Sequence, residues 1–562
     1  MSYVSNLTLD LGPGPASPMS RLGTQKDQDG AAGQYFYSLA VTLLLIGAGL
    51  RVWQFGIGAA LWHDELALAR NLVEKSVHEL LTAPLDYAQV APLGFLLVEK
   101  VAITVFGNNE LSLRLFPLIC ALISLPLFAV VASHVLPRGA ALLGVGLFAL
   151  SPALIGFGSQ LKQYSTDVAA ALLMTALTLR WWERRSPVPT RRESVLLGLA
   201  GLLAVCLSHA VVLVLAGLAL SLLIEVFRQR DWATLRRLRP VAICWAAAGL
   251  IGVASGVHTM SSSTRAFMEV YWADGFLPLP PWSDSDALWL WRAFRGFFQR
   301  QFLYPLPAVG VLLMLLGAVA LARRRLWHAF VALAPVGIAL LASATRQYPF
   351  GDRVSLFLLP SMLLLVAAGI DLARHAGAAW WRPLGTIVVV LALAAPAHAL
   401  YANYPMYPKQ PMSDVLAYVQ GRRQADDAVY VYIGAQHAVA YYGPRFGLPA
   451  EAVVIGGCPR DGVRGLLRDL DQFRGRPRLW LIISHAIGPS RERETMLSYL
   501  DAIGIRRDGI RIGDSRLSPS AHLYDLSDPD RLRAASAETQ TLPARLAGAR
   551  EYSCIAEAPR TR

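Results

Sequence analysis

Residues 92–107 read PLGFLLVEKVAITVFG, and the way this segment lies decides the topology of the whole chain. The segment is apolar, but it is short and carries Glu99 and Lys100 at its middle. A membrane-spanning helix needs about 20 residues and disfavours charges at its centre. We therefore expect an interfacial helix that lies along a membrane surface. If the segment crossed the membrane instead, every later loop would change sides.

The composition indicates that the rest of the chain is embedded in a membrane. Of the 562 residues, 54% are hydrophobic and 16% are charged, whereas soluble proteins average about 25% charged residues. The formal net charge is +13, and Arg residues gather in short clusters between apolar runs, as in cytoplasmic loops. This pattern disfavours a nucleic-acid partner. None of the five Cys forms a CxxC pair, which disfavours a zinc or thioredoxin-type site.

We predict a polytopic α-helical membrane protein with about 11 transmembrane helices. Residues 194–227 would be roughly 51 Å long as one helix, against a hydrocarbon core of about 30 Å, so they are divided into two spans. With residues 92–107 at the interface, the Arg-rich loops hold fifteen Lys or Arg residues and the short outer turns hold three. The positive-inside rule then places the N-terminus in the cytoplasm and the C-terminal region outside. The expected spans are 35–58, 111–134, 139–158, 166–182, 194–209, 211–227, 241–258, 303–322, 327–344, 355–373 and 383–401.

The chain divides into three parts. Residues 1–33 have no apolar core and are expected to form a disordered cytoplasmic tail, not a cleavable signal peptide. Residues 34–401 form the transmembrane domain, in a bacterial inner (plasma) membrane. Residues 402–562 alternate short apolar runs with helical patterns, which predicts a soluble α/β domain on the periplasmic side. If that side is oxidising, Cys458 and Cys554 can form a disulfide. The alternating runs are 413–422, 428–433, 462–471, 478–484 and 491–503.

Polar side chains gather on the predicted outer side, while the spans carry almost no charge at their centres. The sequence Trp62-His63-Asp64-Glu65 directly follows the first span, and two adjacent carboxylates at a membrane surface are costly without a purpose. A transporter would place polar groups at the midplane, whereas an enzyme acting on a lipid headgroup needs them at one interface. The distribution favours an enzyme. The other outer residues are Gln89, Arg114, Lys162, Tyr164, Asp167, His209, His258, Arg265, Tyr348, Asp352 and Arg353.

One reaction that these residue types suit is the transfer of a sugar from a lipid phosphate. The departing phosphate needs cations, and the acceptor hydroxyl needs a carboxylate base, for which Asp64 is the candidate. Asp64 has an alternative role as an N-cap of the helix expected over 65–73. The cations and the two Tyr side chains could instead be interfacial anchors. The candidates for binding the donor phosphate are Lys162, Arg114, Arg265 and Arg353, with Tyr164 and Tyr348 beside them.

Five motifs in the same order resemble those of the GT-C glycosyltransferases, with the protein O-mannosyltransferases and the lipid A aminoarabinose transferases as the nearest branches. The resemblance covers about residues 35–401. It implies a polyprenyl-phosphate-sugar donor, an inverting transfer and interfacial helices in the first outer loop. The acceptor is left open between a lipid, a polysaccharide and a protein. The motifs are WHDE (62–65), QVAPL (89–93), FGNNELSLRL (106–115), KQYSTD (162–167) and YPFGDR (348–353).

The resemblance also implies roles for single residues. Asp64 corresponds to the catalytic base with Glu65 beside it, and Asp167 matches a second carboxylate of the family. Some relatives have a Lys-Pro pair where this chain has Ala91-Pro92, so the phosphate contact of that Lys is not implied here. No metal ligand is assigned, although the chemistry leaves room for a divalent cation. The alternative from another class is a non-enzymatic flippase or assembly scaffold for lipid-linked glycans.

Overall fold

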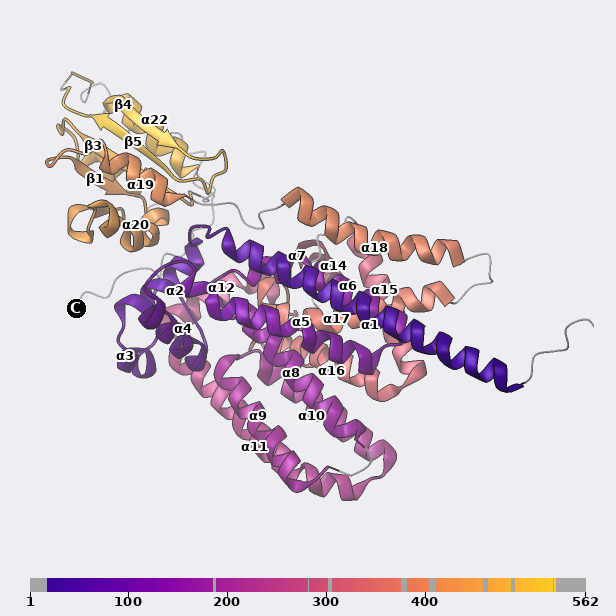
Figure 1. Cartoon of the computed structure of the whole chain (residues 1–562). Coiled ribbons are helices and arrows are strands. Elements are labelled where there is room, and N and C mark those ends of the chain that lie inside the picture. The colour runs from indigo at the N-terminus through magenta and orange to yellow at the C-terminus, as the bar shows by residue number, and fades with distance from the viewer. Residues whose placement is uncertain are drawn as a thin grey trace, which may run out of the picture.

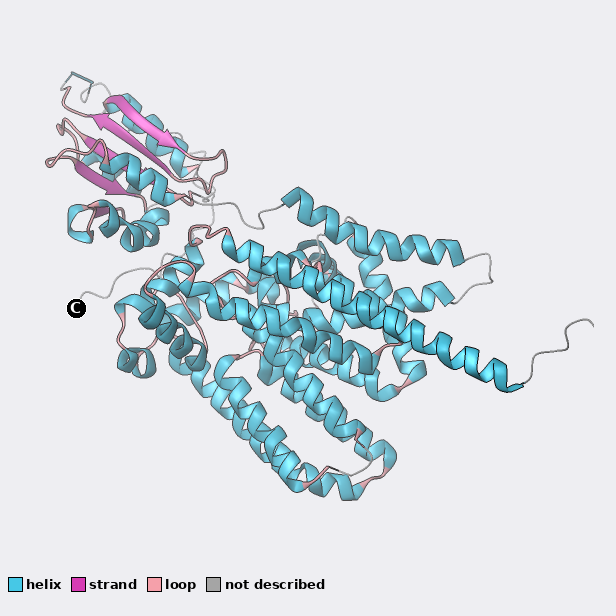
Figure 2. Ribbon diagram, viewed as in Figure 1, coloured by secondary structure: helices cyan, strands magenta, loops and turns pink. Residues whose placement is uncertain are grey.

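A bundle of long helices forms most of the molecule, and a small α/β domain lies at one end of it (Figure 1). Figure 2 shows that the strands belong to the small domain. Cys458 and Cys554, expected to pair in a disulfide, lie outside the described residues. The computed structural model describes residues 18–184, 189–281, 283–301, 306–375, 382–403, 411–457, 463–486, 491–528 and 530–531.

The helices of the bundle follow the apolar runs of the sequence, because a helix satisfies its backbone hydrogen bonds internally and can cross a lipid layer. Within the described ranges, seven helices are long and apolar enough to span a membrane; the number of eleven spans stays a prediction. The bounds are α1 Pro18–Gly56, α2 His63–Glu74, α3 Val77–Thr82, α4 Leu93–Phe106, η1 Ser112–Arg114, α5 Leu115–Val135, α6 Arg138–Ala149, α7 Pro152–Phe157, α8 Tyr164–Glu183, α9 Arg191–Leu207, α10 Val211–Gln229, α11 Trp232–Thr259, α12 Ser262–Tyr271, η2 Ala273–Gly275, α13 Asp284–Ala287, α14 Trp289–Gln301, α15 Pro307–Arg324, α16 Leu326–Ala344, η3 Asp352–Leu358, α17 Leu359–His375 and α18 Arg382–Asn403.

Two expectations about helix boundaries are confirmed. The apolar stretch over 194–227 is divided into α9 and α10, and the hydroxyl of Ser208 between them accepts the backbone N–H of Val211 at 3.1 Å. The segment that decides the topology forms the short helix α4. The Nζ of Lys100 donates to the carbonyl oxygens of Leu72 and Lys75 at 2.6 and 2.8 Å. Lys100 therefore stabilises the C-terminal end of α2, where cations are favoured.

Contacts between helix ends show which loops share an end of the bundle. Arg324 pairs with Asp371 at 3.1 Å, and His328 lies 2.7 Å from Glu183. The ends of α8, α15 and α17 and the start of α16 therefore lie together, about 18 Å along α17 from its first residue. Helices α2, α3 and α4 lie at the end of the bundle that faces the C-terminal domain (Figure 1). The loops predicted as cytoplasmic and as outer are thus separated, as the predicted topology requires.

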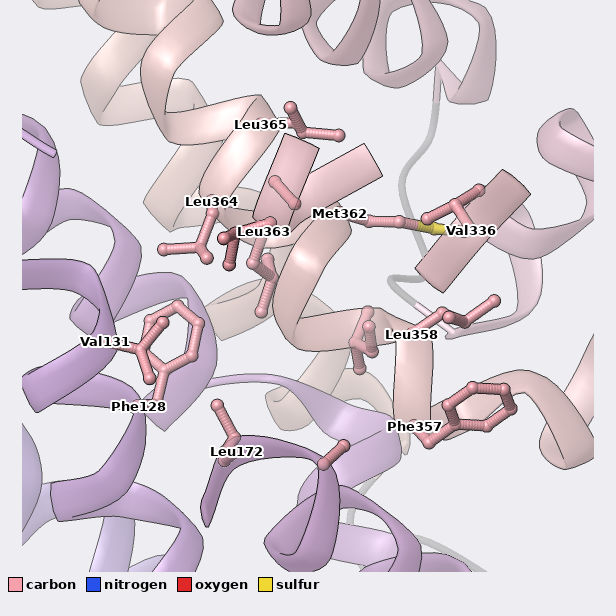
Figure 3. Close-up of a cluster of buried hydrophobic side chains, with 14 of the residues drawn as sticks. Phe128, Val131, Leu172, Val336, Phe357, Leu358, Met362, Leu363, Leu364 and Leu365 are labelled. Atoms are coloured by element: carbon pink, nitrogen blue, oxygen red, sulfur yellow. The ribbon is translucent and has the colours of Figure 1, made fainter. Parts of the chain in front are cut away.

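The centre of the bundle is α17. In its most apolar window 78% of the residues are buried, compared with 11% in α1, which runs along the outside. Figure 3 shows the side chains of Met362, Leu363 and Leu364 among those of Phe128 and Leu172, from α5 and α8. A helix that is apolar all round is buried against other helices. Helix α17 therefore holds the turn that precedes it, residues 348–353, in a fixed position.

Two glycines let α15 and α17 approach closely. A Cβ on Gly317 would lie 1.7 Å from the carbonyl oxygen of Leu365, and a Cβ on Gly369 would lie 1.9 Å from that of Leu313. Small residues at the same positions of two helices permit such backbone contact in membranes, where packing drives helix association. These glycines fix the distance between the two helices.

The C-terminal domain confirms the predicted α/β class. Its five strands have the order β2-β1-β3-β5-β4. β1 is parallel to β2 and β3, and β5 is antiparallel to β3 and β4. The strand β3 is buried along its whole length, as its apolar sequence LWLII predicts. The bounds are α19 Met412–Gln420, β1 Ala428–Val431, η5 Ile433–Ala435, α20 Gln436–Tyr442, η6 Gly443–Phe446, η7 Ala450–Ala452, β2 Val454–Ile455, α21 Val463–Asp471, β3 Leu479–Ile483, α22 Glu492–Ile503, β4 Ile505–Arg511 and β5 Ser520–Asp525.

Candidate active site

The first turn of α2 carries both carboxylates of the acidic motif. Trp62 is the N-cap, and its backbone N–H donates to Oε2 of Glu65 at 2.9 Å. Carboxylates are stabilised in this position by the positive end of the helix dipole. The alternative in which Asp64 caps the helix is wrong, because α2 begins at His63 and Asp64 lies within its first turn.

Glu65 joins three segments of the chain. It is 2% exposed, and both of its oxygens accept hydrogen bonds. Oε1 accepts from Nε of Arg114 at 2.9 Å and from the backbone N–H of Leu161 at 2.7 Å, and Oε2 accepts from Nη2 of Arg114 at 2.8 Å. Charge-assisted bonds of this kind hold side chains in one geometry. The predicted catalytic role of Glu65 stays a prediction; the bonds that it makes orient its neighbour Asp64.

Asp64 faces the turn that precedes α17. Its Oδ2 lies 2.6 Å from Nη2 of Arg353, which follows Gly351 and Asp352 in η3. Both preceding residues have positive φ, 115° at Gly351 and 51° at Asp352, so the backbone reverses sharply before Arg353. The guanidinium of Arg353 also lies 6.0 Å from the ring centroid of Trp272. The aromatic loop after α12 therefore covers one side of the ion pair.

Lys162 brings a second cation to the site. It is 8% exposed, and its Nζ donates to Oε1 of Gln89 at 2.6 Å. Burial lowers the pKa of this ammonium to about 8, with Asp64 opposing the shift. Burial alone would raise the pKa of the Asp64 carboxyl, but the charges of Lys162 and Arg353 hold it at about 2. At neutral pH the site therefore contains two cations and one carboxylate, which favours the binding of an anion.

Three further predicted residues lie around this group. Tyr164, the first residue of α8, interacts electrostatically with Arg353, Asp64 and Asp167. The hydroxyl of Tyr348 donates to the backbone carbonyl of Val354 at 2.8 Å and interacts electrostatically with Tyr164 and Asp167. Asp167 is buried, and its Oδ1 has no hydrogen-bond partner among the residues that the structure describes. The structure thus brings Tyr164, Asp167 and Tyr348 to the site.

Two predicted phosphate ligands are placed differently. Arg114 is buried, and it donates to Glu65 and to the carbonyl oxygen of Ala59 at 2.5 Å. Arg265 is exposed on α12, and in the described part of the chain no hydrogen bond or ion pair joins it to Asp64. Lys162 and Arg353 therefore lie near Asp64, whereas Arg114 holds Glu65, and the phosphate-binding roles stay predictions.

Histidines from the C-terminal domain complete the surroundings of Asp64. The ring of His63 lies 5.0 Å from that of His437 and 4.8 Å from that of His485. The ring of Trp62 lies 5.0 Å from His485, and Nη1 of Arg70 lies 3.1 Å from Nδ1 of His437. Sequence reasoning missed both residues because they follow different strands of another domain, with no motif around them.

Hydrogen bonds join the C-terminal domain to the residue before the acidic motif and to the loop after α4. The backbone N–H of Leu61 donates to the hydroxyl of Tyr442 at 3.0 Å. The hydroxyl of Tyr441 donates to Oδ1 of Asn108 at 2.6 Å, and Arg445 donates to the carbonyl oxygen of Asn108 at 2.9 Å. Asn108 belongs to the FGNNELSLRL motif, so this motif forms part of the docking surface of the C-terminal domain.

Among the residues that the structure describes, no three His, Cys, Asp or Glu side chains are grouped so that they could hold a metal ion. The carboxylates of Asp64 and Glu65 are paired with Arg353 and Arg114.

Comparisons with known proteins give relatives in structure only. No family model matches the chain, and no curated protein matches its sequence. ArnT from Cupriavidus metallidurans in the apo state has a TM-score of 0.49 and 12% identity, over 88% of this chain and 98% of that one. The oligosaccharyltransferase AglB from Archaeoglobus fulgidus, in complex with an inhibitory peptide and a dolichol-phosphate, has a TM-score of 0.48 and 12% identity, over 84% and 73%. The arabinofuranosyltransferase AftD from Mycobacteria has a TM-score of 0.43 and 14% identity, over 88% and 42%. All three are GT-C glycosyltransferases, the superfamily that the motifs of this chain resemble.

Proposed function

We propose that the protein transfers a sugar from a polyprenyl-phosphate donor to an acceptor hydroxyl at the outer face of the membrane, with inversion. One observation carries the proposal: the carboxylate of Asp64 pairs with Arg353 and interacts electrostatically with a second cation, Lys162, at one end of a bundle of apolar helices. The motif resemblance supplies the class of donor. Asp64 is the general base in this proposal, and the cations bind the phosphate.

Each group has one task in the reaction. The oxygen of the acceptor hydroxyl attacks the anomeric carbon from the face opposite the phosphate, and its proton passes to the carboxylate of Asp64. The bond between the anomeric carbon and the phosphate oxygen breaks, and its electron pair leaves with the polyprenyl phosphate. Lys162 and Arg353 stabilise the negative charge that develops on this leaving group.

Donor binding also prepares Asp64 for this task. In the free protein Lys162 and Arg353 hold the pKa of Asp64 at about 2, and burial acts in the opposite direction. A carboxylate with so low a pKa is a weak base at neutral pH. When the donor phosphate binds to the same cations, its negative charge offsets theirs and raises the pKa of Asp64. The base therefore becomes stronger when the donor is in place.

An apolar groove suits the lipid chain of the donor. It has a volume of about 790 Å³ and runs along α11 and the start of α10. At the end of α11 the carbonyl oxygen of Thr259 accepts the backbone N–H of Leu85 at 3.0 Å, four residues before Gln89, the partner of Lys162. The residue after His258, which lines the groove, is thus joined to the segment that carries the partner of Lys162. It is lined by Val212, Ala246, Gly249, Leu250, Val253, Ala254, Val257 and His258.

The test uses the purified full-length protein with a panel of polyprenyl-phosphate sugars, and mass spectrometry detects sugar release or transfer. Asp64→Asn keeps the size of the side chain and removes its basicity. Because a positioned general base contributes typically 10²–10⁴-fold, we expect transfer to fall by about that factor, while donor binding is not weakened because the variant removes a negative charge beside the phosphate. A flippase or scaffold would work normally with Asn at position 64, and normal transfer by this variant refutes the proposed base.

A further inference from the structure

His437 and His485 both lie at the carboxyl ends of neighbouring parallel strands. His485 follows β3 after Ser484, and His437 lies in the first turn of α20, after β1 and η5. β1 and β3 pair in parallel. In open α/β sheets, ligands bind in the crevice outside the carboxyl ends of such strands. In this protein that edge of the sheet faces the first turn of α2, where Trp62 and His63 contact the two histidines.

The contacts of Ser484 favour one tautomer of His485. The hydroxyl of Ser484 donates to the carbonyl oxygen of Leu517 at 3.2 Å, and its oxygen lies 3.0 Å from Nδ1 of His485. In the tautomer that satisfies both contacts at once, the hydroxyl proton is directed to the carbonyl and Nδ1–H donates to the Ser484 oxygen. This assignment leaves Nε2 of His485 as a lone-pair acceptor.

That acceptor atom has no partner. Nε2 of His485 is buried and makes no hydrogen bond with any residue that the structure describes. Burial lowers the pKa of the imidazole to about 3, so the ring is neutral at physiological pH. A buried acceptor without a donor is uncommon in proteins and costs stability. Its position beside Asp64, with which it interacts electrostatically, indicates that a bound substrate supplies the missing donor.

We propose that Nε2 of His485 accepts a hydrogen bond from a hydroxyl of a saccharide acceptor, so that the C-terminal domain forms the acceptor-binding side of the site. This inference rests on the proposed function. Asp64 and His485 are two separate proton acceptors, and one molecule satisfies both only if it carries neighbouring hydroxyls. A sugar ring has neighbouring hydroxyls, whereas a Ser or Thr side chain has a single one. The rings of Trp62, His63 and His437 form an aromatic wall around His485, with polar ring nitrogens at its edges.

The experiment separates acceptor binding from donor binding. The full-length protein is incubated with the donor identified by the panel, labelled in its sugar, and with membranes from cells that lack the protein. The labelled product identifies the acceptor, and rates are measured against acceptor concentration. Binding of undecaprenyl phosphate alone is measured in parallel. The variants are His485→Phe, which removes the lone pair and keeps the ring, and His485→Gln, whose amide oxygen restores an acceptor.

His522→Phe is the matched control, because His522 is also a buried histidine of the C-terminal domain whose Nε2 has no hydrogen-bond partner among the described residues. It lies on β5, away from the carboxyl ends of β1 and β3. We expect His485→Phe to raise the KM for the acceptor about tenfold, the size of one buried hydrogen bond, with kcat and the affinity for undecaprenyl phosphate unchanged. His485→Gln should recover part of the loss, and His522→Phe should behave like the wild type.

Other results overturn the inference in distinguishable ways. Wild-type KM in His485→Phe, or equal losses in His485→Phe and His522→Phe, removes His485 from the acceptor site. A loss of phosphate affinity together with transfer assigns His485 to the donor side or to folding. Label found on a protein or on a lipid without sugar refutes the saccharide acceptor while the proposed transferase function stands. A wild-type protein that neither releases nor transfers sugar refutes the proposed function, and the inference fails with it.

Discussion

Asp64 and Glu65 are adjacent in the sequence, and their surroundings differ. Glu65 is enclosed by Arg114 and backbone N–H groups that are part of the fold. Asp64 is partly exposed, and its partner Arg353 is a cation that a phosphate can share. A buried charge that is fully paired with protein groups holds structure, whereas a paired charge at an open site can exchange its partner. The two residues are thus distinguished by what surrounds them.

Glu65→Gln therefore tests structure more than catalysis. It leaves the guanidinium of Arg114 buried without a compensating charge, which should cost about 3–5 kcal/mol of the free energy of unfolding. Asp64→Asn is the control, with an expected change within about 1 kcal/mol because its ion pair is partly exposed. Thermal unfolding of both variants in detergent provides the measurement. Equal unfolding midpoints would show that Arg114 does not depend on Glu65.

The pKa of Lys162 predicts how phosphate affinity depends on pH. Burial lowers this pKa from 10.5 to about 8 in the free protein. Bound phosphate favours the protonated amine, so binding takes up a proton above pH 8, and the affinity for undecaprenyl phosphate should fall by up to about tenfold per pH unit there. The measurement is a binding titration between pH 7.5 and about 9.5, above the second phosphate pKa of about 6.

Two variants assign this pH dependence to one residue. Lys162→Gln and Arg353→Gln should each weaken binding by about 1.5–3 kcal/mol, the value of a charge-assisted hydrogen bond. Only Lys162→Gln should also lose the decline above pH 8, because Arg353→Gln keeps the titrating amine. If affinity is the same in both variants as in the wild type, the two cations are interfacial anchors and do not bind the donor.

At the scale of helices, the contact between α15 and α17 requires glycine at Gly317 and Gly369, because a Cβ at either position would clash with the backbone of the other helix. Gly369→Ala places a Cβ 1.9 Å from the carbonyl oxygen of Leu313, so the helices must separate, at a cost of about 1–3 kcal/mol or more. Gly337→Ala in α16 is the control, because no atom lies within 4 Å of its new Cβ. There we expect a gain of about 0.5–1 kcal/mol from helix propensity. Thermal unfolding distinguishes the two, and similar stability would contradict the close contact.

The elements that the sequence predicts well are those with a local physical cause. Apolar length divides α9 from α10, and the short segment with Glu99 and Lys100 forms α4. The alternating runs after residue 402 become β1 and β3 with helices between them. Contacts that depend on tertiary packing could not be predicted. Arg51, for example, lies on the first apolar helix, and its guanidinium donates to the carbonyl oxygen of Ala149 at 3.1 Å.

At the scale of the whole molecule, the sidedness of the loops is the prediction to test. The two groups of loops lie at different ends of the bundle, and the count of basic residues places the Arg-rich end in the cytoplasm. Reporter fusions should place residue 109 outside and residues 138, 187 and 233 inside. A cytoplasmic reporter at 109 would reverse the assignment of every later loop, and with it the outer-face location of the site.

The site itself was predictable in part. Asp64, Lys162, Tyr164 and Arg353 belong to motifs, and topology alone brings them to one end. The histidines of the C-terminal domain were not predictable, because 367 residues separate Arg70 from its partner His437. Arg70 and His437 come into contact only when the C-terminal domain docks on the bundle. For Arg265 the sequence was misleading. Its charge and its predicted loop suited a phosphate ligand, but the side chain is exposed on α12.

The contacts between His63 and the histidines of the C-terminal domain have a consequence for the order of synthesis and folding. A ribosome that adds 5–20 residues per second completes the WHDE motif roughly 20–80 s before it reaches His485. Until the last domain has folded and docked, the acidic turn lacks the contacts with His437, His485 and Tyr442. The nascent chain can therefore be inserted and its bundle assembled while the candidate site still lacks the residues of the C-terminal domain. Truncated chains that stop before β3 lack one wall of the candidate site, so premature termination yields a chain in which this site is incomplete.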